Sequence, residues 1–351
     1  MCVVASPTGP PMDRADRFTG CLLGSAVGDS LLLPMEGLPR STIARRFAGP
    51  LRQRLVCGRG MVSDDTEHAF LAAQALIAAG DDAGRFGRAL ARRLRWWLLG
   101  LPAGCGKATG LGLLRSWCGL SPGRSGVRSA GNGPAMRSAI IGLRWAEDRE
   151  RRRSFVAIST AITHRDILAL DAAQAVAEAA AWTVGGEPLD RLWERWLADA
   201  AEPAWAERLR TMRALLEAGA PVDELAQRIG CIEHVSAYAL HSVPVTLYAW
   251  LRHRHDPEAC LQSVMTCGGD TDTMGAIAGS LLGCEDGPSV FPAPMLRIHA
   301  WPMSLATMRR SAEALAHGET QPVSWCWPMQ PVRNFGFLAV VLAHGIRRLL
   351  P

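Results

Sequence analysis

Apolar residues recur at steps of three and four along most of this chain, and this periodicity constrains its fold more than any other feature. Such steps place the apolar side chains on one face of a helix. The clearest examples are Leu168, Ala172, Ala175, Ala179 and Trp182; Met274, Ile277 and Leu281; and Phe70, Ala73 and Ile77. Alternation typical of strands is almost absent: only residues 242–248 look strand-like, and Pro244 weakens that interpretation. The sequence therefore predicts an all-α fold.

The helical segments are expected to form one compact many-helix domain over residues 13–351, preceded by a loose N-terminal tail over residues 1–12. No segment has the composition of a linker between independent domains. Residues 204–229 read as two helices around a Gly-Ala-Pro turn at 219–221. The passage 287–327, rich in Pro, Met and Trp, matches no motif. We interpret it as an apolar packing loop, with a cap over the site or a partner contact as alternatives.

Composition and charge exclude several classes of protein. Hydrophobic residues make up 48% and charged residues 20% of the 351 residues, as in ordinary globular proteins. The net charge of +5 is spread over separate short arginine runs, and Lys107 is the only lysine, so the basic stripe of a nucleic-acid-binding protein is missing. The apolar run 335–344 is too short to span a membrane. We therefore expect that neither nucleic acid nor membrane is a partner. We also expect the protein to be a monomer.

The cysteines indicate a reducing compartment. Ten cysteines are scattered along the chain without a Cys-x-x-Cys pair, which favours free thiols over disulfides or a zinc site. The first twelve residues lack the charged start and apolar run of a secretory leader. We expect a cytoplasmic location, with secretion by a leaderless route left open.

Two acidic segments stand directly before helical runs. Residues 63–67, Ser-Asp-Asp-Thr-Glu, suit a helix N-terminus capped by Ser63, although adjacent carboxylates are held together best by a cation. Residues 268–273, Gly-Gly-Asp-Thr-Asp-Thr, offer more oxygen ligands than capping uses. Such ligands suit Mg²⁺ or Mn²⁺, whereas zinc would need His or Cys. If the segments face each other, their four aspartates are enough for two divalent ions.

Acids also follow a segment rich in small residues near the N-terminus. Gly20, Gly24 and Gly28 line one helix face, which suits close helix packing. Asp29 and Glu36 then flank an apolar run, where carboxylates need partners or solvent.

Two further segments carry candidate binding residues. The Gly-Asn-Gly turn at 131–133 exposes N–H groups that can cradle phosphate, although most such turns are only turns. His164 stands just before the Ala-rich helix, where a single histidine is more often structural than ligand-binding.

These five segments, taken in their order along the chain, resemble the motifs of the ADP-ribosylglycohydrolase family over roughly residues 16–283. The resemblance implies a compact all-α domain with a binuclear Mg²⁺ or Mn²⁺ site in a cleft. It also implies a metal-dependent enzyme that hydrolyses the bond between the anomeric carbon of ADP-ribose and a side chain of a modified protein. Such a bond breaks through an oxocarbenium-like transition state.

By the same resemblance, each motif residue takes a role. The implied metal ligands are Ser63, Asp64, Asp65, Asp270, Asp272 and Thr273. The implied substrate-binding residues are Asp29, Ser129, Gly131, Asn132, Gly133, His164 and Gly269. The implied catalytic residues are Glu36, Asp65 and Asp270, and whether Glu36 or a metal-ligating aspartate transfers the proton stays open.

Departures from the family pattern leave the acceptor open. Leu32 stands where a small residue is usual, so we expect a narrower wall near the substrate ribose, and Pro134 removes an N–H donor from the turn. The alternatives are a hydrolase of a small ADP-ribose derivative, such as O-acetyl-ADP-ribose, and a non-catalytic ADP-ribose-binding or immunity module.

Overall fold

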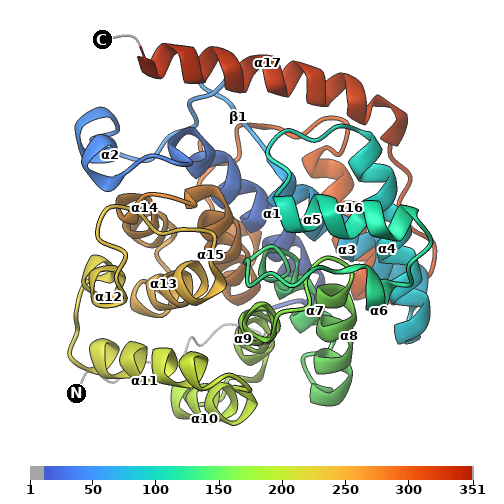
Figure 1. The fold of residues 1–351 in the computed structure, drawn as a ribbon, viewed down its shortest axis with the longest axis horizontal. Coiled ribbons are helices and arrows are strands. Elements are labelled where there is room, and N and C mark those ends of the chain that lie inside the picture. Colours follow the sequence, from blue (N-terminus) through green and yellow to red (C-terminus); the bar gives the residue numbers. More distant parts are fainter. Residues whose placement is uncertain (1–11, 350–351) are drawn as a thin grey trace.

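The computed structural model describes residues 12–349, so the tail predicted over residues 1–12 lies outside it except for Met12. Over the described residues almost every element is a helix (Figure 1). In chain order the elements are α1 (Arg14–Leu32), η1 (Leu33–Met35), α2 (Arg40–Arg46), β1 (Gly60–Met61), α3 (Asp64–Ala79), α4 (Ala83–Leu99), α5 (Lys107–Trp117), α6 (Pro122–Ser125), η2 (Ala135–Arg137), α7 (Ala139–Arg144), α8 (Arg149–Ala161), α9 (Ile167–Gly185), α10 (Leu189–Asp199), α11 (Pro203–Glu217), α12 (Val222–Arg228), α13 (Ala239–Arg252), α14 (Pro257–Cys267), α15 (Thr271–Asp286), η3 (Pro288–Val290), β2 (Ile298–His299), α16 (Leu305–Ala316), η4 (Trp327–Met329) and α17 (Gln330–Leu349).

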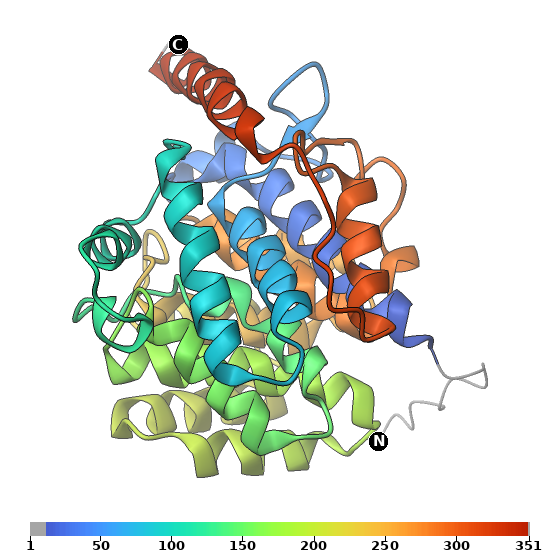
Figure 2. The ribbon, with the colours of Figure 1, turned by 90° about the vertical axis from the view of Figure 1, so that its right-hand side faces the viewer.

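The prediction of a single all-α domain is confirmed. One continuous buried core joins the N-terminal and C-terminal helices. Helices α10 and α11 lie at one end of the molecule, and α17 lies across the opposite end in both views (Figures 1 and 2). The only strands among the described residues, β1 and β2, form a short parallel pair.

Two sequence interpretations are corrected by this architecture. Residues 242–248 are not a strand but part of α13, with Pro244 inside the helix. Its short run of apolar and β-branched residues suits a strand and a buried helix alike, so periodicity could not distinguish the two. The passage 287–327 is not a loop throughout, because it contains α16, which packs Met308 and Leu315 into the core.

Helices α1 and α15 form the centre of the fold. Both are long, apolar and almost wholly buried, and α1 from Phe18 to Leu32 has no exposed residue. Within residues 12–349, two helical stretches are long and apolar enough to span a membrane, Arg14–Met35 and Ile167–Gly185, but their most apolar windows are 100% and 72% buried inside the protein. Packing in the core therefore accounts for their hydropathy.

The glycine stripe predicted to allow close packing lies in this central helix pair. A Cβ atom added to Gly24 would lie 2.0 Å from the carbonyl oxygen of Gly279, and one added to Gly28 would lie 1.8 Å from that of Gly275. The helices run antiparallel with backbones in contact. Since the last turn of α1 meets the first turn of α15, the pairing sets Asp29 beside the acidic N-terminus of α15.

Candidate metal and substrate site

Three aspartates from different parts of the chain meet at the ends of α1, α3 and α15. Oxygens of Asp29, Asp65 and Asp272 all lie within 4.8 Å of one another. Each of these carboxylates is buried and keeps one oxygen, Oδ1, without a hydrogen-bond partner among the described residues. Buried polar atoms are rarely left in this state, so a missing ligand is indicated.

Asp29 holds the N-terminus of α3 against α1 with its other oxygen. Its Oδ2 accepts hydrogen bonds from the Ser63 N–H at 2.8 Å and from the Thr66 hydroxyl and N–H. The sequence analysis placed Asp29 with the substrate-binding residues, whereas the structure places it in the acidic cluster. Thr66 was not singled out by sequence reasoning, since a threonine in the first turn of a helix is common.

Asp65 connects the two acidic segments. Its Oδ2 accepts hydrogen bonds from the Ser63 hydroxyl at 3.1 Å and from the Thr273 hydroxyl of α15 at 3.2 Å. The Ser63 side chain also accepts the Asp65 N–H, so it caps α3 as predicted while it contacts the cluster. The capping interpretation and the cluster interpretation therefore both hold.

Three further acids border the solvent side of this cluster. Asp64 and Asp270 are half-buried, and Glu36, just after η1, is exposed. Asp270 is the N-cap residue of α15 but makes no side-chain capping bond; its Oδ2 accepts a hydrogen bond from the Asn132 amide instead. Capping therefore does not explain this acid.

The concentration of charge shifts the acid equilibria of the cluster. Burial, followed by the charges of neighbouring acids, raises the pKa of Asp64, Asp65 and Asp272 well above the usual range. Burial raises the pKa of Asp29 to about 6, against the hydrogen bonds from Thr66 and Ser63. In the absence of cations, holding these carboxylates together is unfavourable in free energy, and bound cations would remove this repulsion.

The donor chemistry fits hard divalent cations. All candidate ligands are carboxylate or hydroxyl oxygens, and neither His nor Cys belongs to the group of close ligand atoms found among the described residues. The three unpartnered oxygens are free to act as ligands of a cation.

The Gly-Asn-Gly turn lies beside the acids. The Asn132 amide donates to both Asp270 and the Ser242 hydroxyl, and its N–H donates to the Ala237 carbonyl. Among the described residues, the N–H groups of Gly131 and Gly133 donate to no protein acceptor. Asn132 thus fixes the turn, and its two glycines keep donors for an anion.

His164 supports this turn from behind. An added Cβ would lie 3.1 Å from the His164 ring at Gly131 and also at Gly133, so ring and turn are in contact. Burial, with a smaller effect of Arg137, lowers the pKa of His164 to about 3, so the ring is neutral at pH 7.

Arg137 is a positioning residue that sequence reasoning missed. Its guanidinium is fully buried and donates to the Gly133 carbonyl at 3.0 Å and to the Thr163 hydroxyl at 2.9 Å. That hydroxyl contacts His164 Nδ1 at 2.9 Å. The arginine thereby positions the Gly-Asn-Gly turn and, through Thr163, the His164 ring that contacts it. Because the sequence contains many arginines, nothing in it indicated that this one is buried.

Two of the remaining predicted residues take other positions. Gly269 has a φ of +82° and packs against Val235, and its N–H donates to the Leu38 carbonyl, so it shapes the chain path and offers no free donor. Leu32 is fully buried against Gly275 and forms no wall on the solvent side. The Leu32 side chain thus packs against the central helix pair, and a narrower ribose site stays a prediction.

The remaining turn residues lie at the site's edge. Ser129 is half-buried beside Gly131, and Pro134 is buried and is the N-cap residue of η2, with a φ of −66°. Fold and site together define an all-helical protein with an acidic centre that suits divalent cations and a neighbouring turn that suits an anion.

Comparison with known proteins identifies the class. Residues 10–322 match the sequence model of the ADP-ribosylglycohydrolase family, so the chain belongs to this family. A chain of a solved ADP-ribosylglycohydrolase-related protein complex superposes with a TM-score of 0.67 and 28% sequence identity, covering 87% of this chain and 99% of that one.

Curated relatives agree with this assignment. An uncharacterized protein of Archaeoglobus fulgidus is 29% identical over 280 residues, covering 77% of this chain and 88% of the relative. The uncharacterized protein YegU of Escherichia coli is 26% identical over 331 residues, covering 86% and 97%. The ADP-ribosyl-(dinitrogen reductase) glycohydrolase of Rhodospirillum rubrum is 25% identical over 305 residues, covering 82% and 91%. Family membership supports a hydrolase of the ADP-ribosylglycohydrolase type.

Proposed function

We propose that this protein is a metal-dependent hydrolase that removes ADP-ribose from a modified protein side chain by cleaving the glycosidic bond at the anomeric carbon. The observation that carries the proposal is the meeting of Asp29, Asp65 and Asp272, each with an unpartnered buried oxygen. The family and the named Rhodospirillum relative support the ADP-ribosyl chemistry.

Two divalent cations, Mg²⁺ or Mn²⁺, are the proposed cofactors. The residues that would hold them are those predicted from the two acidic segments, with Asp29 added: Asp29, Ser63, Asp64, Asp65, Asp270, Asp272 and Thr273. Bound there, the ions would supply positive charge beside the ribose hydroxyls and the attacking water.

The turn would bind and orient the substrate. The free N–H groups of Gly131 and Gly133 suit the diphosphate, and Asn132 ties the turn to Asp270, which fixes the distance between diphosphate and acids. Because His164 stays neutral, it adds no positive charge and serves as a rigid wall behind the turn.

Glu36 is the proposed proton-transfer group. Its carboxylate is exposed and close enough to Asp64 and Asp272 to raise the pKa of both. Asp65, the alternative, is 1% exposed and already accepts two hydroxyl hydrogen bonds. Exchange of a proton with water is therefore easier at Glu36.

The decisive experiment measures release of ADP-ribose from a panel of modified proteins with known linkages, in excess Mg²⁺ and after chelation. Asp65→Asn should lower turnover by at least about 100-fold, because the isosteric amide removes a charge needed to hold the cation. The same change at the exposed Asp190, whose side chain is 73% accessible, should leave turnover unchanged. If Asp65→Asn retains near-normal release, the metal assignment is wrong.

The same assay separates the other functions. Release from O-acetyl-ADP-ribose but from no modified protein would identify a small-molecule hydrolase. Retention of ADP-ribose without turnover would identify a binding module. Which acceptor side chain is cleaved follows from the panel.

We further propose that the protein acts as a monomer in the cytoplasm. All described cysteines are free, as the sequence predicted, and several are buried. Analytical ultracentrifugation and fractionation of the native host would test the two parts.

A further inference from the structure

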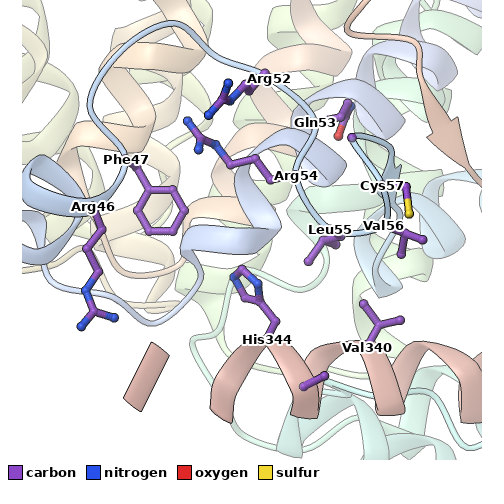
Figure 3. A pocket seen from close by; sticks show the side chains of 12 residues that line it. Arg46, Phe47, Arg52, Gln53, Arg54, Leu55, Val56, Cys57, Val340 and His344 are labelled. Atoms are coloured by element: carbon purple, nitrogen blue, oxygen red, sulfur yellow. The ribbon is translucent and has the colours of Figure 1, made fainter. Parts of the chain in front are cut away.

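A pocket lies away from the acidic cluster, between the chain segment 46–58 and α17 (Figure 3). Its volume is about 740 Å³. Segment 46–58 joins α2 to β1 and supplies most of the wall, and α17 supplies Val340, Ala343 and His344. None of its lining residues belongs to the acidic cluster, and none is Asp or Glu.

Two arginines of this segment, Arg52 and Arg54, point to the same side of the chain (Figure 3). They are two residues apart, the spacing at which side chains share a side when the backbone is extended. Gln53 between them points the other way and is buried, and its amide donates to the Ser30 hydroxyl at 2.9 Å and to the Met295 carbonyl at 2.8 Å. Figure 3 shows both guanidinium groups on one side of the segment and Gln53 on the other. The buried amide therefore holds the stretch of backbone from which both arginines extend.

In the described part of the chain, no carboxylate balances this arginine pair. Among the described residues, neither guanidinium forms an ion pair, and the sequence contains no Asp or Glu from Gly37 to Ser63. Arg54 stacks on the Phe47 ring at 5.4 Å, and burial together with the charge of Arg52 lowers the pKa of Arg54. Two neighbouring cations without a carboxylate partner among the described residues would be stabilised by a bound anion.

The opposite wall adds a ring and an apolar surface. His344 reaches from α17 toward η1, with Nε2 3.3 Å from the Pro34 carbonyl, and Val340 lies one turn before it. The pocket thus combines a cationic side with a partly apolar side.

We propose that this pocket binds a phosphorylated anion through Arg52 and Arg54. Guanidinium groups match phosphate oxygens with paired, charge-assisted hydrogen bonds, and a pair of them suits more than one negative charge. The anion is either a soluble phosphate compound or a phosphorylated lipid headgroup. The outer face of α17 exposes Phe335, Leu342 and Ile346, which a lipid surface could contact and a soluble compound would not need.

The test is calorimetric titration of the full chain with inorganic pyrophosphate at low ionic strength, in parallel with co-sedimentation on vesicles with and without phosphoinositide. Arg52 is exposed, so Arg52→Gln leaves the fold intact and carries the test; Arg54→Gln is a second variant, checked by circular dichroism. Arg45→Gln, an exposed neighbour on α2 that does not line the pocket, is the matched control. Pyrophosphate can also bind the turn at 131–133, so only the part of the binding that Arg52→Gln removes counts for the pocket.

We expect Arg52→Gln to weaken binding by at least about tenfold, the loss of one charge-assisted hydrogen-bond pair, with no change in Arg45→Gln. Weaker binding of pyrophosphate by Arg52→Gln supports a soluble ligand. Weaker binding of this variant to phosphoinositide vesicles alone supports a lipid headgroup. If neither probe binds, or if wild type and Arg52→Gln bind equally, the pocket is not a phosphate site.

Discussion

At the scale of single residues, Arg137 shows how one buried charge organises the proposed substrate site. Its guanidinium donates to Ser159 as well as to Gly133 and Thr163, and it contacts His68 Nδ1. Burial lowers the pKa of Arg137 to about 9, yet the group stays charged at pH 7. A buried cation of this kind is tolerated because nearly every N–H has an acceptor.

Arg137→Lys should therefore be costly although it keeps the charge. An ammonium group has three donors and cannot reach all of these acceptors, so buried acceptors are left without a donor at about 1–3 kcal/mol each. We expect urea unfolding to show a loss of at least about 2 kcal/mol, and the KM for the ADP-ribosylated substrate to rise more than kcat falls. Arg128→Lys, on the exposed chain before the turn, is the control and should change neither quantity. Equal stability of the two variants would contradict the positioning role.

At the scale of elements, the glycine contact between α1 and α15 determines where the acids lie. The backbones meet at Gly20 and Gly283, at Gly24 and Gly279, and at Gly28 and Gly275. Any side chain there would push the helices apart, since protein interiors are close-packed. The same helix contact places Asp29 next to Asp272. The close packing of α1 and α15 and the geometry of the acidic cluster therefore depend on the same glycines.

Gly24→Ala should destabilise the protein and disturb the site. The new methyl group would lie 2.0 Å from a backbone carbonyl that cannot move freely, and overpacking of this kind costs about 1–3 kcal/mol. Metal affinity, measured by calorimetry, should fall as well. Gly336→Ala in α17 is the matched control, because a Cβ there meets nothing within 4 Å, and it should stabilise by about 0.5–1 kcal/mol. A neutral effect of Gly24→Ala would mean that the two helices are less closely packed than described.

At the scale of the whole molecule, the acidic cluster joins segments from both halves of the chain. Asp29 and Asp65 come from the N-terminal helices, and Asp272 comes from α15. Without cations their repulsion and burial oppose the fold, and with cations the same residues hold the halves together. Stability and metal binding should therefore be coupled.

Mg²⁺ or Mn²⁺ should raise the melting temperature, and chelation should reverse the change. A cation at about 100 times its Kd adds about 2.7 kcal/mol to the free energy of unfolding. Asp272→Asn should remove this response and should also raise the melting temperature of the metal-free protein, because one buried charge is lost. Differential scanning calorimetry in chelator-treated, metal-free buffer and in Mg²⁺-containing buffer measures both effects. A metal response that persists in Asp272→Asn would argue against this residue as a ligand.

The sequence by itself determined the helices and most of the candidate residues. Steps of three and four gave α3, α9 and α15, because a helix face is a local property of the chain. The turn at 219–221 and the cap at Ser63 are local as well. A short run of apolar and β-branched residues, as in α13, fits a strand and a buried helix alike, so there the local pattern misleads.

Only the tertiary structure decided which of those residues meet. Asp29 lies in the acidic cluster, and the Leu32 side chain packs against Gly275 of α15. Arg137 and Thr66 have positioning roles that no residue spacing in the sequence indicated. Likewise, Arg52 and Arg54 share a pocket with α17 although the arginines look scattered along the chain. Distances between such groups depend on how close the helices pack and on which backbone contacts their glycines allow, and these are properties of the assembled core rather than of any one segment.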